Sequence, residues 1–425
     1  MIRLRNTLFG TSPLVVHCPG PLHEAWDFFT EAVRAVATPH RAYRESATFV
    51  TWNNGLRPDK PNGLIEECFA RYGCEIQVLG RGVQPWRNVN KLRMTADALA
   101  NATSEYCVGL DSGDVLIVEH PDEIVRRFRM HFTCDLLFNA TGAACWPELP
   151  QYVMFERSLP GAATSHGRCW LNAGAFVGRT DFCRRYFAEL ADFAERNDAP
   201  EDQSAVKATW PQWYPSVQID DRCQIFQWFN ESREIFQIQR TTADRQRQLI
   251  EWLRPLSPVR WGAEVGVLDG YTSDVLLQSF PELNLWMVDR WEPFQGSGLD
   301  FLDAAGFERL RRMTLWWTSH AATRRFELRR ESAQVAAEFP ESSLDFVFID
   351  ADHTYEAVRR DLKAWWSKVR PGGLLCGHDY GVYGDATGEW GVSQAADEFA
   401  AANSSQITIG WDGMWSMTRT DRKLP

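Results

Sequence analysis

The stretch Tyr106-Cys-Val-Gly-Leu-Asp-Ser-Gly-Asp-Val-Leu-Ile117 decides how the first half of the chain is interpreted. Its apolar beginning predicts a buried strand, and this strand ends on two carboxylates, Asp111 and Asp114. Ser112 and Gly113 between them allow a tight turn, so both acids can face one point. Because neither acid is stable when it is buried and unpaired, the pattern indicates either a divalent cation site or a hydrogen-bonded turn at a strand end.

The composition is that of a globular protein long enough for two domains. The chain has 425 residues, of which 44% are hydrophobic and 24% are charged, and two domains of about 200 residues are an ordinary division of this length. The net charge is -11, and no run of Lys or Arg offers a stripe that could follow phosphates. These features argue against a nucleic-acid partner.

The cysteines and the hydropathy pattern indicate the cellular compartment in which the protein is expected. None of the ten cysteines forms a C-x-x-C pair, so a zinc ribbon or a dithiol redox motif finds no support. The N-terminal residues contain no apolar segment of signal-peptide length, and no run of about 18 apolar residues occurs anywhere. We therefore expect a soluble, cytoplasmic protein without a membrane span.

Strand-like and helix-like patterns alternate ahead of the opening stretch. Strands are expected at residues 12–19, 48–52 and 75–79, and helices at about 22–36, 64–72 and 89–102. This alternation predicts βαβ units, an α/β fold and a mainly parallel sheet. Ligands of such sheets bind beyond the carboxyl ends of the strands, and Asp111 and Asp114 lie at that position.

The pattern becomes less regular after Cys134 and regular again near residue 248. Between them we expect strands at 135–139 and 171–178 and a helix at about 181–196. A polar run between about Glu231 and Arg247 predicts a domain junction. We place the domains at residues 1–240 and 241–425.

The second half predicts another Rossmann-like α/β domain. Apolar residues at helical spacing between Val358 and Val369 predict a helix capped by Thr354 and stopped by Pro371-Gly-Gly373. Strands are expected at residues 261–267, 284–289, 326–329, 344–350, 373–377, 406–409 and 414–418.

A series of motifs in the first half resembles a known family. Over about residues 46–230 the chain resembles the glycosyltransferase domain of lysyl hydroxylases and related collagen glycosyltransferases, which are GT-A folds that use UDP-sugars with Mn2+. No single motif is specific, and the resemblance depends on their order. The motifs are Leu79-Gly, Trp86, Val89-Asn-Lys91, Leu110-Asp-Ser-Gly-Asp-Val115, Cys145-Trp-Pro-Glu148, Leu171-Asn-Ala-Gly-Ala-Phe-Val-Gly178, Glu201-Asp-Gln203 and Asp220-Asp-Arg-Cys-Gln-Ile-Phe-Gln227.

This resemblance implies roles for individual residues. Asp111 and Asp114 would bind the Mn2+ that bridges the two phosphates of the nucleotide sugar, and a cation there stabilises the charge of the leaving diphosphate. Thr51 would lie near the uridine. Asp202 is the candidate catalytic carboxylate that contacts the donor, and the alternative for Asp202 is an exposed acid before a helix. Further residues implied to bind the donor or to shape the sugar and acceptor pocket are Gly20, Lys91, Trp146, Glu148, Asn172 and Gln203.

The sequence departs from the family at the third metal ligand. In the family this ligand is a His in an H-G-N-G-P motif near the end of the domain, and nothing similar follows Gln227. The N-terminal segment Val15-Val-His-Cys-Pro-Gly-Pro21 resembles that motif, with His17 in the ligand position. We interpret this as a circular permutation, which chain ends close together on a surface permit. A satisfied strand-end histidine is the alternative for His17, and Asp221 would be the next ligand candidate. The family's Lys after the motif is replaced by His23, so diphosphate contacts would be weaker or pH-dependent.

The second half resembles class I S-adenosylmethionine-dependent methyltransferases over about residues 248–420, in particular the small O-methyltransferase group. Glycine-rich loops also occur in NAD-binding folds, and the two later motifs favour the methyltransferases. The resemblance implies that Glu264, Gly266, Asp289 and Ser332 bind the cofactor, with Asp289 at the ribose and Ser332 near the adenine. The motifs are Ala263-Glu-Val-Gly-Val-Leu-Asp-Gly270, Phe346-Val-Phe-Ile-Asp-Ala-Asp-His353 and Arg370-Pro-Gly-Gly-Leu-Leu-Cys-Gly-His-Asp-Tyr380.

A metal-assisted branch of that family implies a second metal site. Asp350 and Asp379 match acids that hold Mg2+ in sugar O-methyltransferases, and His353 matches the base that takes the proton from a sugar hydroxyl. A histidine that caps the following helix is the alternative for His353. His378 stands where the family has another acid, so the identity and the presence of the metal stay open.

Together the two resemblances predict a bifunctional glycan-modifying enzyme. It would transfer a hexose from a UDP-sugar and methylate a hydroxyl of a glycan or glycosylated acceptor with S-adenosylmethionine. Two alternatives stay open at this point. One domain alone could be catalytic while the other is degenerate, or the chain could be a non-catalytic carbohydrate-binding scaffold. No feature of the sequence indicates an oligomeric state.

Overall fold

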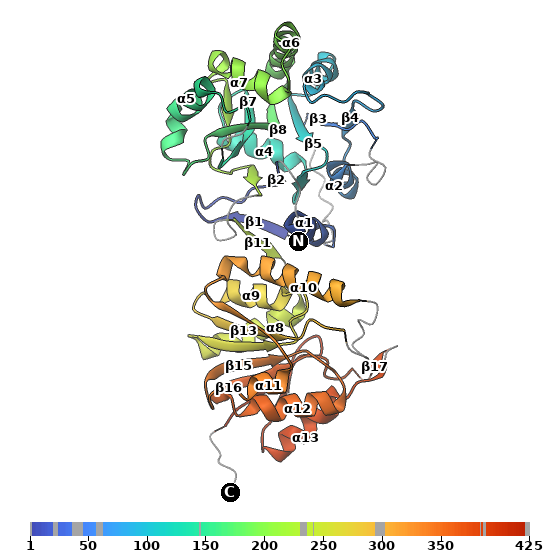
Figure 1. Cartoon of the computed structure of the whole chain (residues 1–425), viewed down its shortest axis with the longest axis vertical. Helices are drawn as coiled ribbons and strands as arrows, with labels where there is room; N and C mark the ends of the chain where they lie inside the picture. The colour runs from blue at the N-terminus through green and yellow to red at the C-terminus, as the bar shows by residue number, and fades with distance from the viewer. Residues whose placement is uncertain are drawn as a thin grey trace. The chain divides into compact units, whose positions relative to one another are not determined.

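The computed structural model of the chain divides into two compact units, Met1–Arg240 and Thr241–Pro425 (Figure 1). Each unit has its own sheets and its own core. Among the described residues, no helix combines the length and the apolar character that crossing a membrane requires. The structure describes residues 2–19, 24–35, 46–56, 63–143, 146–229, 236–240, 242–293, 302–382, 384–385 and 388–420.

The main sheet of the first unit has six strands in the order β4-β3-β5-β8-β7-β9. Strands β4, β3 and β5 are parallel, whereas β8 runs antiparallel to both β5 and β7. Because β7 and β9 are parallel as well, three of the five strand pairs are parallel, and the expectation of a mainly parallel sheet is confirmed with β8 as the exception. The reason is that the chain re-enters β8 at the end where β7 stopped, with Thr141 opposite Trp170. The strands are β3 (Ala47–Trp52), β4 (Gln77–Leu79), β5 (Tyr106–Asp111), β7 (Leu136–Thr141), β8 (Trp170–Arg179) and β9 (Val217–Ile219).

The helices of the first unit bury their apolar faces on this sheet. In α6 the buried residues recur every three or four positions, so one stripe of the helix faces the core. This stripe packs with α3 over Val50 and Phe176 of the sheet. The helices are α1 (Glu24–Arg34), α2 (Leu64–Tyr72), α3 (Asn90–Ala100), α4 (Asp122–His131), α5 (Pro150–Ser158), η1 (Pro160–Ala163), α6 (Thr180–Arg196) and α7 (Asp202–Trp213).

Two small sheets complete the first unit. Strand β2 lies between β10, to which it is parallel, and β6, to which it is antiparallel. The register puts His17 opposite Val115, the residue after Asp114. Strand β1 pairs with β11, which lies in the polar run that is predicted to join the two domains. The strands are β1 (Ile2–Asn6), β2 (Val15–His17), β6 (Val115–Ile117), β10 (Phe226–Trp228) and β11 (Phe236–Arg240).

The second unit is built on a seven-stranded sheet with the order β14-β13-β12-β15-β16-β20-β19. The first five strands of this order are parallel, and β20 is antiparallel to both of its neighbours. The chain reverses its direction of winding between β12 and β15, and such a switch point is where open α/β sheets bind ligands. The strands are β12 (Trp261–Val265), β13 (Asn284–Asp289), β14 (Arg325–Arg329), β15 (Leu344–Ile349), β16 (Val369–Gly377), β19 (Ile407–Ile409) and β20 (Trp415–Thr418), with a separate pair β17 (Gly384–Asp385) and β18 (Gly388–Glu389).

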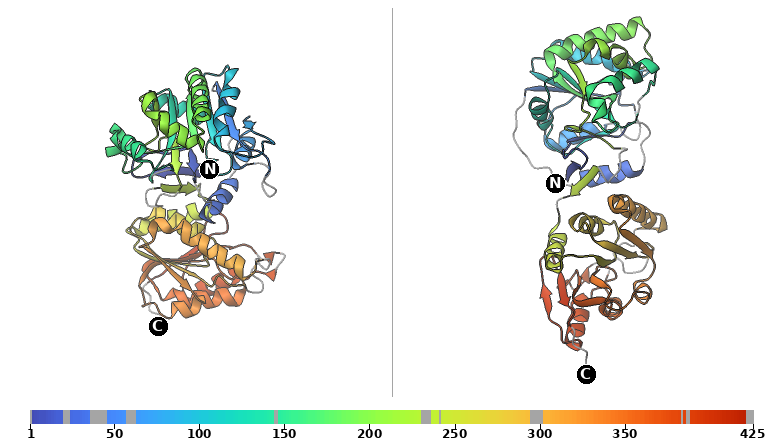
Figure 2. Two further views of the ribbon diagram at one scale, coloured as in Figure 1. Left: turned by 45° about the horizontal axis from the view of Figure 1, so that its top comes forward. Right: turned by 90° about the vertical axis from the view of Figure 1, so that its left-hand side faces the viewer.

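Helices cover both faces of this sheet (Figures 1 and 2). One core joins α12 and α13 to Val265, Val347 and Leu375 of the strands. The other core joins α8, α9 and α10 to Met287 and Phe348, which point to the opposite face. The helices are α8 (Asp244–Leu253), η2 (Arg254–Leu256), α9 (Tyr271–Ser279), α10 (Ala304–Trp317), η3 (Ser319–Ala321), α11 (Ser332–Ala336), α12 (Tyr355–Trp366) and α13 (Val392–Ala402).

Helix α12 begins where the sequence predicts and ends earlier. Thr354 is its N-cap residue, although the Thr354 side chain makes no capping hydrogen bond. The helix stops at Trp366, and Val369 already belongs to β16, where it pairs with Leu344. The expectation that Pro371-Gly-Gly373 stops the helix is therefore wrong. An apolar residue at helical spacing serves equally well in a buried strand, so periodicity alone does not locate this boundary.

Candidate functional sites

A residue of α2 supports the turn after β5 through a hydrogen bond. The Ser112 hydroxyl donates to Glu66 Oε2 (2.9 Å), and the Asn53 side-chain amide donates to Glu66 Oε1 (2.9 Å). The helix start packs directly on this turn, because a Cβ at Gly63 would lie 1.6 Å from Ser112 Oγ. Glu66 is a site residue that the sequence argument missed. An acid on an amphipathic helix resembles any solvent-facing acid, so no local pattern could have identified it.

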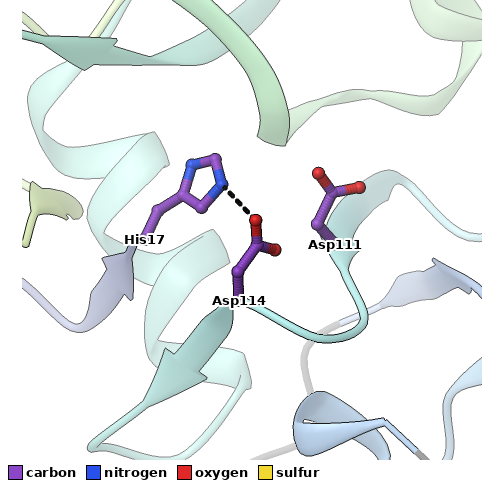
Figure 3. A group of neighbouring side chains, drawn as sticks. All are labelled: His17, Asp111 and Asp114. Atoms are coloured by element: carbon purple, nitrogen blue, oxygen red, sulfur yellow. Dashed lines mark ion pairs between the residues drawn. The ribbon is translucent and has the colours of Figure 1, made fainter. Parts of the chain in front are cut away.

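Two segments that are distant in sequence, β2 and the turn between β5 and β6, bring His17, Asp111 and Asp114 together (Figure 3). Each of the three offers a ligand atom, and these atoms lie within 4.8 Å of one another. His17 Nε2 is 3.5 Å from Asp114 Oδ2. The position of His17 follows from the antiparallel pairing of β2 with β6. The structure thus places the predicted third ligand beside the two acids.

Gly174 on β8 leaves the space that this cluster occupies. A Cβ at this position would lie 2.4 Å from His17 Cε1 and 2.7 Å from Asp111 Oδ2. Real Cβ atoms do not approach neighbours so closely, so any side chain at Gly174 would displace a member of the cluster. The motif Leu171–Gly178 contains this glycine, but its role becomes visible only when the strands are assembled.

Lys91 on α3 neutralises part of the negative charge of the cluster. Its Nζ lies 2.7 Å from Asp111 Oδ1 and 3.5 Å from Asp202 Oδ2. Burial raises the pKa of Asp111 to about 6, although Lys91 opposes the shift. Burial would also raise the pKa of Asp114, but His17 and then Lys91 outweigh it and hold that pKa below its usual range. The two acids share one site and differ in proton affinity, as closely spaced carboxylates do.

The residues of this cluster fit a divalent cation. The Asn139 side-chain Nδ2 lies 3.0 Å from His17 Nδ1. Asn139 Oδ1 is buried, and the described part of the chain offers it no hydrogen-bond partner. If the amide is rotated by half a turn, Oδ1 accepts the Nδ1–H of His17 and leaves Nε2 free to bind a metal. One imidazole nitrogen and two carboxylates form a donor set suited to ions such as Mn2+.

The cluster opens into a cavity of about 470 Å³ whose walls include Lys91, Asp111 and Asp114. Trp52 and Trp86 also line it and offer aromatic faces. Such a concave space with a few converging charges is typical of a small-molecule site. A possible cation site, a cationic side chain and aromatic faces together suit a ligand that carries both negative charge and a flat ring.

Two further residues predicted to contact the donor or to shape its pocket, Thr51 and Trp146, do not line this cavity. Thr51 is fully buried in β3, and the cavity wall at this strand is formed by Trp52 and Asn53. Trp146 is 53% exposed and does not line the cavity. Gly20 lies outside the described residues, as does His23.

The N-terminus of α7 faces β8. Asp202 is buried and is joined to the cluster through Lys91, so the alternative of an exposed acid does not apply. Gln203 accepts from Ala173 N (2.8 Å) and donates to Leu171 O (3.0 Å). The Asn172 side chain accepts from Gly174 N (2.9 Å). In this structure Asn172 and Gln203 therefore shape β8, which carries Gly174.

In the second unit, a cavity of about 530 Å³ lies at the carboxyl ends of the central strands. It collects the predicted cofactor residues and the predicted metal residues at one place. Its lining includes Glu264, Gly266, Asp289, Ser332, Asp350, His353, His378 and Asp379.

Gly266 is required by the packing of two strands. Its φ is +86°, and a Cβ would lie 2.1 Å from the backbone oxygen of Asp350. Any side chain at this position would therefore collide with the backbone that follows β15. Glu264 is buried beside it and accepts a hydrogen bond from Ser273 Oγ. Burial raises the pKa of Glu264 well above its ordinary value.

Asp289 and Ser332 organise the loops around the cavity. Asp289 Oδ2 accepts from the backbone N–H groups of Val267 (2.8 Å) and Leu268 (3.0 Å), and Oδ1 accepts from Trp291 N (2.7 Å). A carboxylate has about four acceptor sites, so capacity for one more donor remains. Ser332 begins α11, and its hydroxyl accepts from the Trp365 indole (2.9 Å).

A second cluster of acids and histidines lies in the same cavity. Asp379 contacts two histidines, with Oδ2 3.0 Å from His353 Nε2 and Oδ1 2.9 Å from His378 Nδ1. Asp350, His378 and Asp379 offer ligand atoms within 4.8 Å of one another. Burial would lower the pKa of His353, but Asp350 and Asp379 outweigh it and raise this pKa to about 9. The His353 ring also lies 4.3 Å from that of Trp390, so its side chain belongs to the cavity and does not act as a helix cap.

Two family models match parts of the chain. Residues 65–254 match the family model described as PLOD GT domain, and residues 263–380 match the one described as methyltransferase domain. The chain therefore contains a glycosyltransferase-like domain of mixed α/β architecture followed by a class I methyltransferase domain. His17 lies outside the matched range, so its place in the cluster is known from the structure alone.

Solved structures similar to the chain include three O-methyltransferases. The enzyme TomG from Streptomyces achromogenes, solved with SAM, is 18% identical, covers 42% of this chain and 82% of its own, and gives a TM-score of 0.32. An O-methyltransferase from Bacillus cereus, solved with SAH, gives 18%, 42%, 83% and 0.31 in the same order. The O-methyltransferase NovP gives 19%, 41%, 78% and 0.33. These values are low, so the assignment of the second unit depends on its strand order and its family match. A comparison with curated proteins finds no match.

Proposed function

We propose that this chain is a bifunctional glycan-modifying enzyme. The first unit would transfer a hexose from a UDP-sugar with Mn2+, and the second would methylate a hydroxyl of a sugar or acceptor with S-adenosylmethionine. One observation supports this most strongly: each domain presents a cluster of metal-binding and proton-accepting side chains to its own cavity.

In the first unit, His17, Asp111 and Asp114 would hold Mn2+, which neutralises the charge of the departing diphosphate when it is bound. Lys91 lines the same cavity and carries a positive charge that could contact the diphosphate. Asp202 is held within 3.5 Å of Lys91, so these two side chains would orient the donor together. Trp52 and Trp86 offer flat faces for the base or the hexose.

In the second unit, Glu264, Gly266, Asp289 and Ser332 would surround S-adenosylmethionine, which supplies the methyl group. Asp350 and Asp379 would orient the His353 imidazole ring, and this imidazole would take the proton of the acceptor hydroxyl when a cation bound to the two acids offsets their charge and lowers the raised pKa of His353. Trp390 lies against His353 and lines the cavity, so it would exclude water from the acceptor side.

The two activities can be tested separately. Wild-type protein should release UDP from UDP-glucose or UDP-galactose with Mn2+, and Asp111→Ala should abolish this release because it removes one metal ligand. A glycan pool incubated with S-adenosylmethionine should gain methyl groups by mass spectrometry, and His353→Ala should lower the rate at least a hundredfold. UDP release that survives Asp111→Ala unchanged would contradict the first half of the proposal. Calorimetry without S-adenosylhomocysteine binding would contradict the second half.

We further propose that the protein acts in the cytoplasm. None of the nine cysteines of the described residues forms a disulfide, and most of them are buried. Burial raises the pKa of several of them, for example Cys68 to about 11, which keeps them unreactive. Free thiols of this kind are usual in a reducing compartment. Fractionation of the host cell, with a thiol count on the purified protein, tests this assignment.

A further inference from the structure

The cluster of the second unit contains a nitrogen ligand that gives its metal site a chemical preference. We propose that Asp350, His378 and Asp379 form a mixed nitrogen and oxygen site that binds a first-row transition ion such as Co2+, Fe2+ or Zn2+ in preference to Mg2+. The inference deepens the methyl-transfer half of the proposed function, and its role in catalysis rests on that proposal. Its test uses the metal alone.

Strand register brings the three side chains together. Ile349 at the end of β15 is paired with Gly377 at the end of β16, so the next residues, Asp350 and His378, leave the sheet side by side. His378 Nδ1 lies 2.9 Å from Asp379 Oδ1 and 4.0 Å from Asp350 Oδ1. In an octahedral site with bonds of ~2.1 Å, neighbouring ligand atoms lie ~3 Å apart. The separation of His378 and Asp379 therefore already suits one shared ion.

The opposite edge of the His378 ring faces a further carboxylate. Its Nε2 lies 3.7 Å from Asp412 Oδ2, and the described residues provide it with no hydrogen bond. The backbone oxygen of His378 accepts from the Trp415 indole (3.1 Å). Histidines that bind metals almost always direct their second ring nitrogen to a carboxylate, a carbonyl or a water, which fixes the ring orientation. Asp412 lies just beyond hydrogen-bond distance, so a small movement would let it accept the Nε2–H and fix the ring with Nδ1 toward Asp350 and Asp379.

The remaining contacts limit the number of oxygen donors. Arg245 Nη1 lies 2.7 Å from Asp350 Oδ2, so only Oδ1 of this carboxylate faces the cluster. Asp379 Oδ2 is similarly occupied by His353. Mg2+ and Ca2+ prefer sites made of oxygen atoms, and Ca2+ requires six to eight of them. Imidazole ligands favour Zn, Fe and neighbouring ions of the first row, so one histidine with two single carboxylate oxygens predicts the proposed preference.

The test measures metal binding by the full-length protein in an Asp111→Asn background, which disables the cluster of the first unit. Calorimetric titration with Co2+ and with Mg2+ should show Co2+ binding at least tenfold tighter. The bound Co2+ should also give a paramagnetically shifted imidazole N–H resonance, which identifies a histidine ligand directly. His378→Asp should remove this resonance and reduce the Co2+ to Mg2+ affinity ratio at least tenfold. Asp412→Asn should weaken Co2+ binding about tenfold, the usual loss when the outer partner of a metal-binding histidine is removed.

A matched control separates this result from a general effect of losing a histidine. His131 is exposed on α4 of the first unit, so His131→Asp should change neither the resonance nor the affinity ratio. Equal affinity for Mg2+ and Co2+, an affinity ratio unchanged by His378→Asp, or the absence of metal at this cluster would each overturn the inference. Metal binding as predicted without methylation of any glycan would instead count against the proposed function and leave the inference standing.

Discussion

At the scale of single residues, the first site depends on the space that is left free and on side chains that never touch a substrate. Gly174 leaves room for His17 and Asp111, and Glu66 holds the turn that carries Ser112. Asp111 and Asp114 could be singled out from the sequence because two acids at a strand end are conspicuous. Gly174 and Glu66 could not, because their neighbours come from other segments.

Gly174→Ala should abolish tight Mn2+ binding at the first site. The new methyl group would lie 2.4 Å from His17 Cε1, so the imidazole ring would have to move away from Asp111 and Asp114. In a His378→Ala background, which removes the second cluster, we expect Mn2+ affinity measured by calorimetry to fall at least tenfold.

Gly161→Ala is the matched control for this substitution. The three atoms nearest to its methyl group would all belong to the side chain of Asp221, which is not part of the cluster, so metal binding should be unchanged. Undiminished Mn2+ affinity in a folded Gly174→Ala variant would show that the three residues do not form the metal site.

Asp361 should make stability depend on pH. Its side chain is buried on α12, and one of its oxygens lacks a hydrogen bond to any described residue. Burial raises its pKa from 3.8 to about 6, against a hydrogen bond from Ser332 and the charge of Arg360. A raised pKa means that the folded state retains the proton longer than the unfolded state. Its stabilisation is therefore complete below pH ~4 and is lost as the pH rises through ~6, in total about 3 kcal/mol.

Asp361→Asn should remove this dependence. We expect the variant to be more stable than the wild type at pH 7, with a flatter profile between pH 4 and 7 in calorimetric melting. Glu251→Gln on the exposed face of α8 should leave the profile unchanged. Parallel profiles for wild type and Asp361→Asn would disprove the assignment.

At the scale of elements, a buried ion pair ties α5 and α7 to β8. Lys207 Nζ lies 3.2 Å from Glu156 Oε1, and both side chains are 1% exposed. Glu156 Oε1 also accepts from the backbone N–H of Leu171 (3.0 Å) at the start of β8. Helices α5 and α7, which are distant from each other in the sequence, thereby fix the strand that carries Asn172 and Gly174.

Lys207→Met should destabilise the first unit by about 3–5 kcal/mol, because the carboxylate of Glu156 would remain buried without its partner. The double variant Glu156→Gln/Lys207→Met should recover part of this loss, since neither side chain is then charged. Denaturant unfolding of the full-length variants measures both effects. A loss below about 1 kcal/mol in the single variant would mean that the pair contributes little.

At the scale of the whole molecule, the two domains carry separate sites. Among the residues that the structure describes, those lining the cavity of the first unit precede position 241, and those lining the cavity of the second follow it. Each unit also has its own cluster of side chains that could hold a metal ion. The chemistry of one site should therefore not require side chains of the other.

Disabling one site should leave the other intact. Asp111→Ala is expected to lose UDP release while keeping wild-type affinity for S-adenosylhomocysteine by calorimetry. His353→Ala should lose methyl transfer and keep UDP release with Mn2+. A change of more than threefold at the unaltered site would reveal coupling between the domains that neither cavity lining explains.

Local patterns determined much of this protein. Alternating strand and helix patterns predicted both α/β domains, and α2 begins and ends at Leu64 and Tyr72 as expected. The acids at strand ends could be recognised in the sequence because a charged side chain directly follows a short apolar segment. These acids are Asp111, Asp114 and Asp350. These features depend on neighbours in sequence, which is why the sequence alone contained them.

Only the tertiary structure decided which distant residues meet. Strand register decides the reversed direction of β8 and the approach of His17 to Asp114. Packing between remote segments decides the supporting contacts, which are those of Gly174, Glu66, Lys207 and Asp412. A hydrophobic period specifies which face of an element is buried, but it does not specify the partner that covers this face. The turn after β5 is thus recognisable in the sequence as a pair of acids, whereas its third ligand comes from the pairing of β2 with β6.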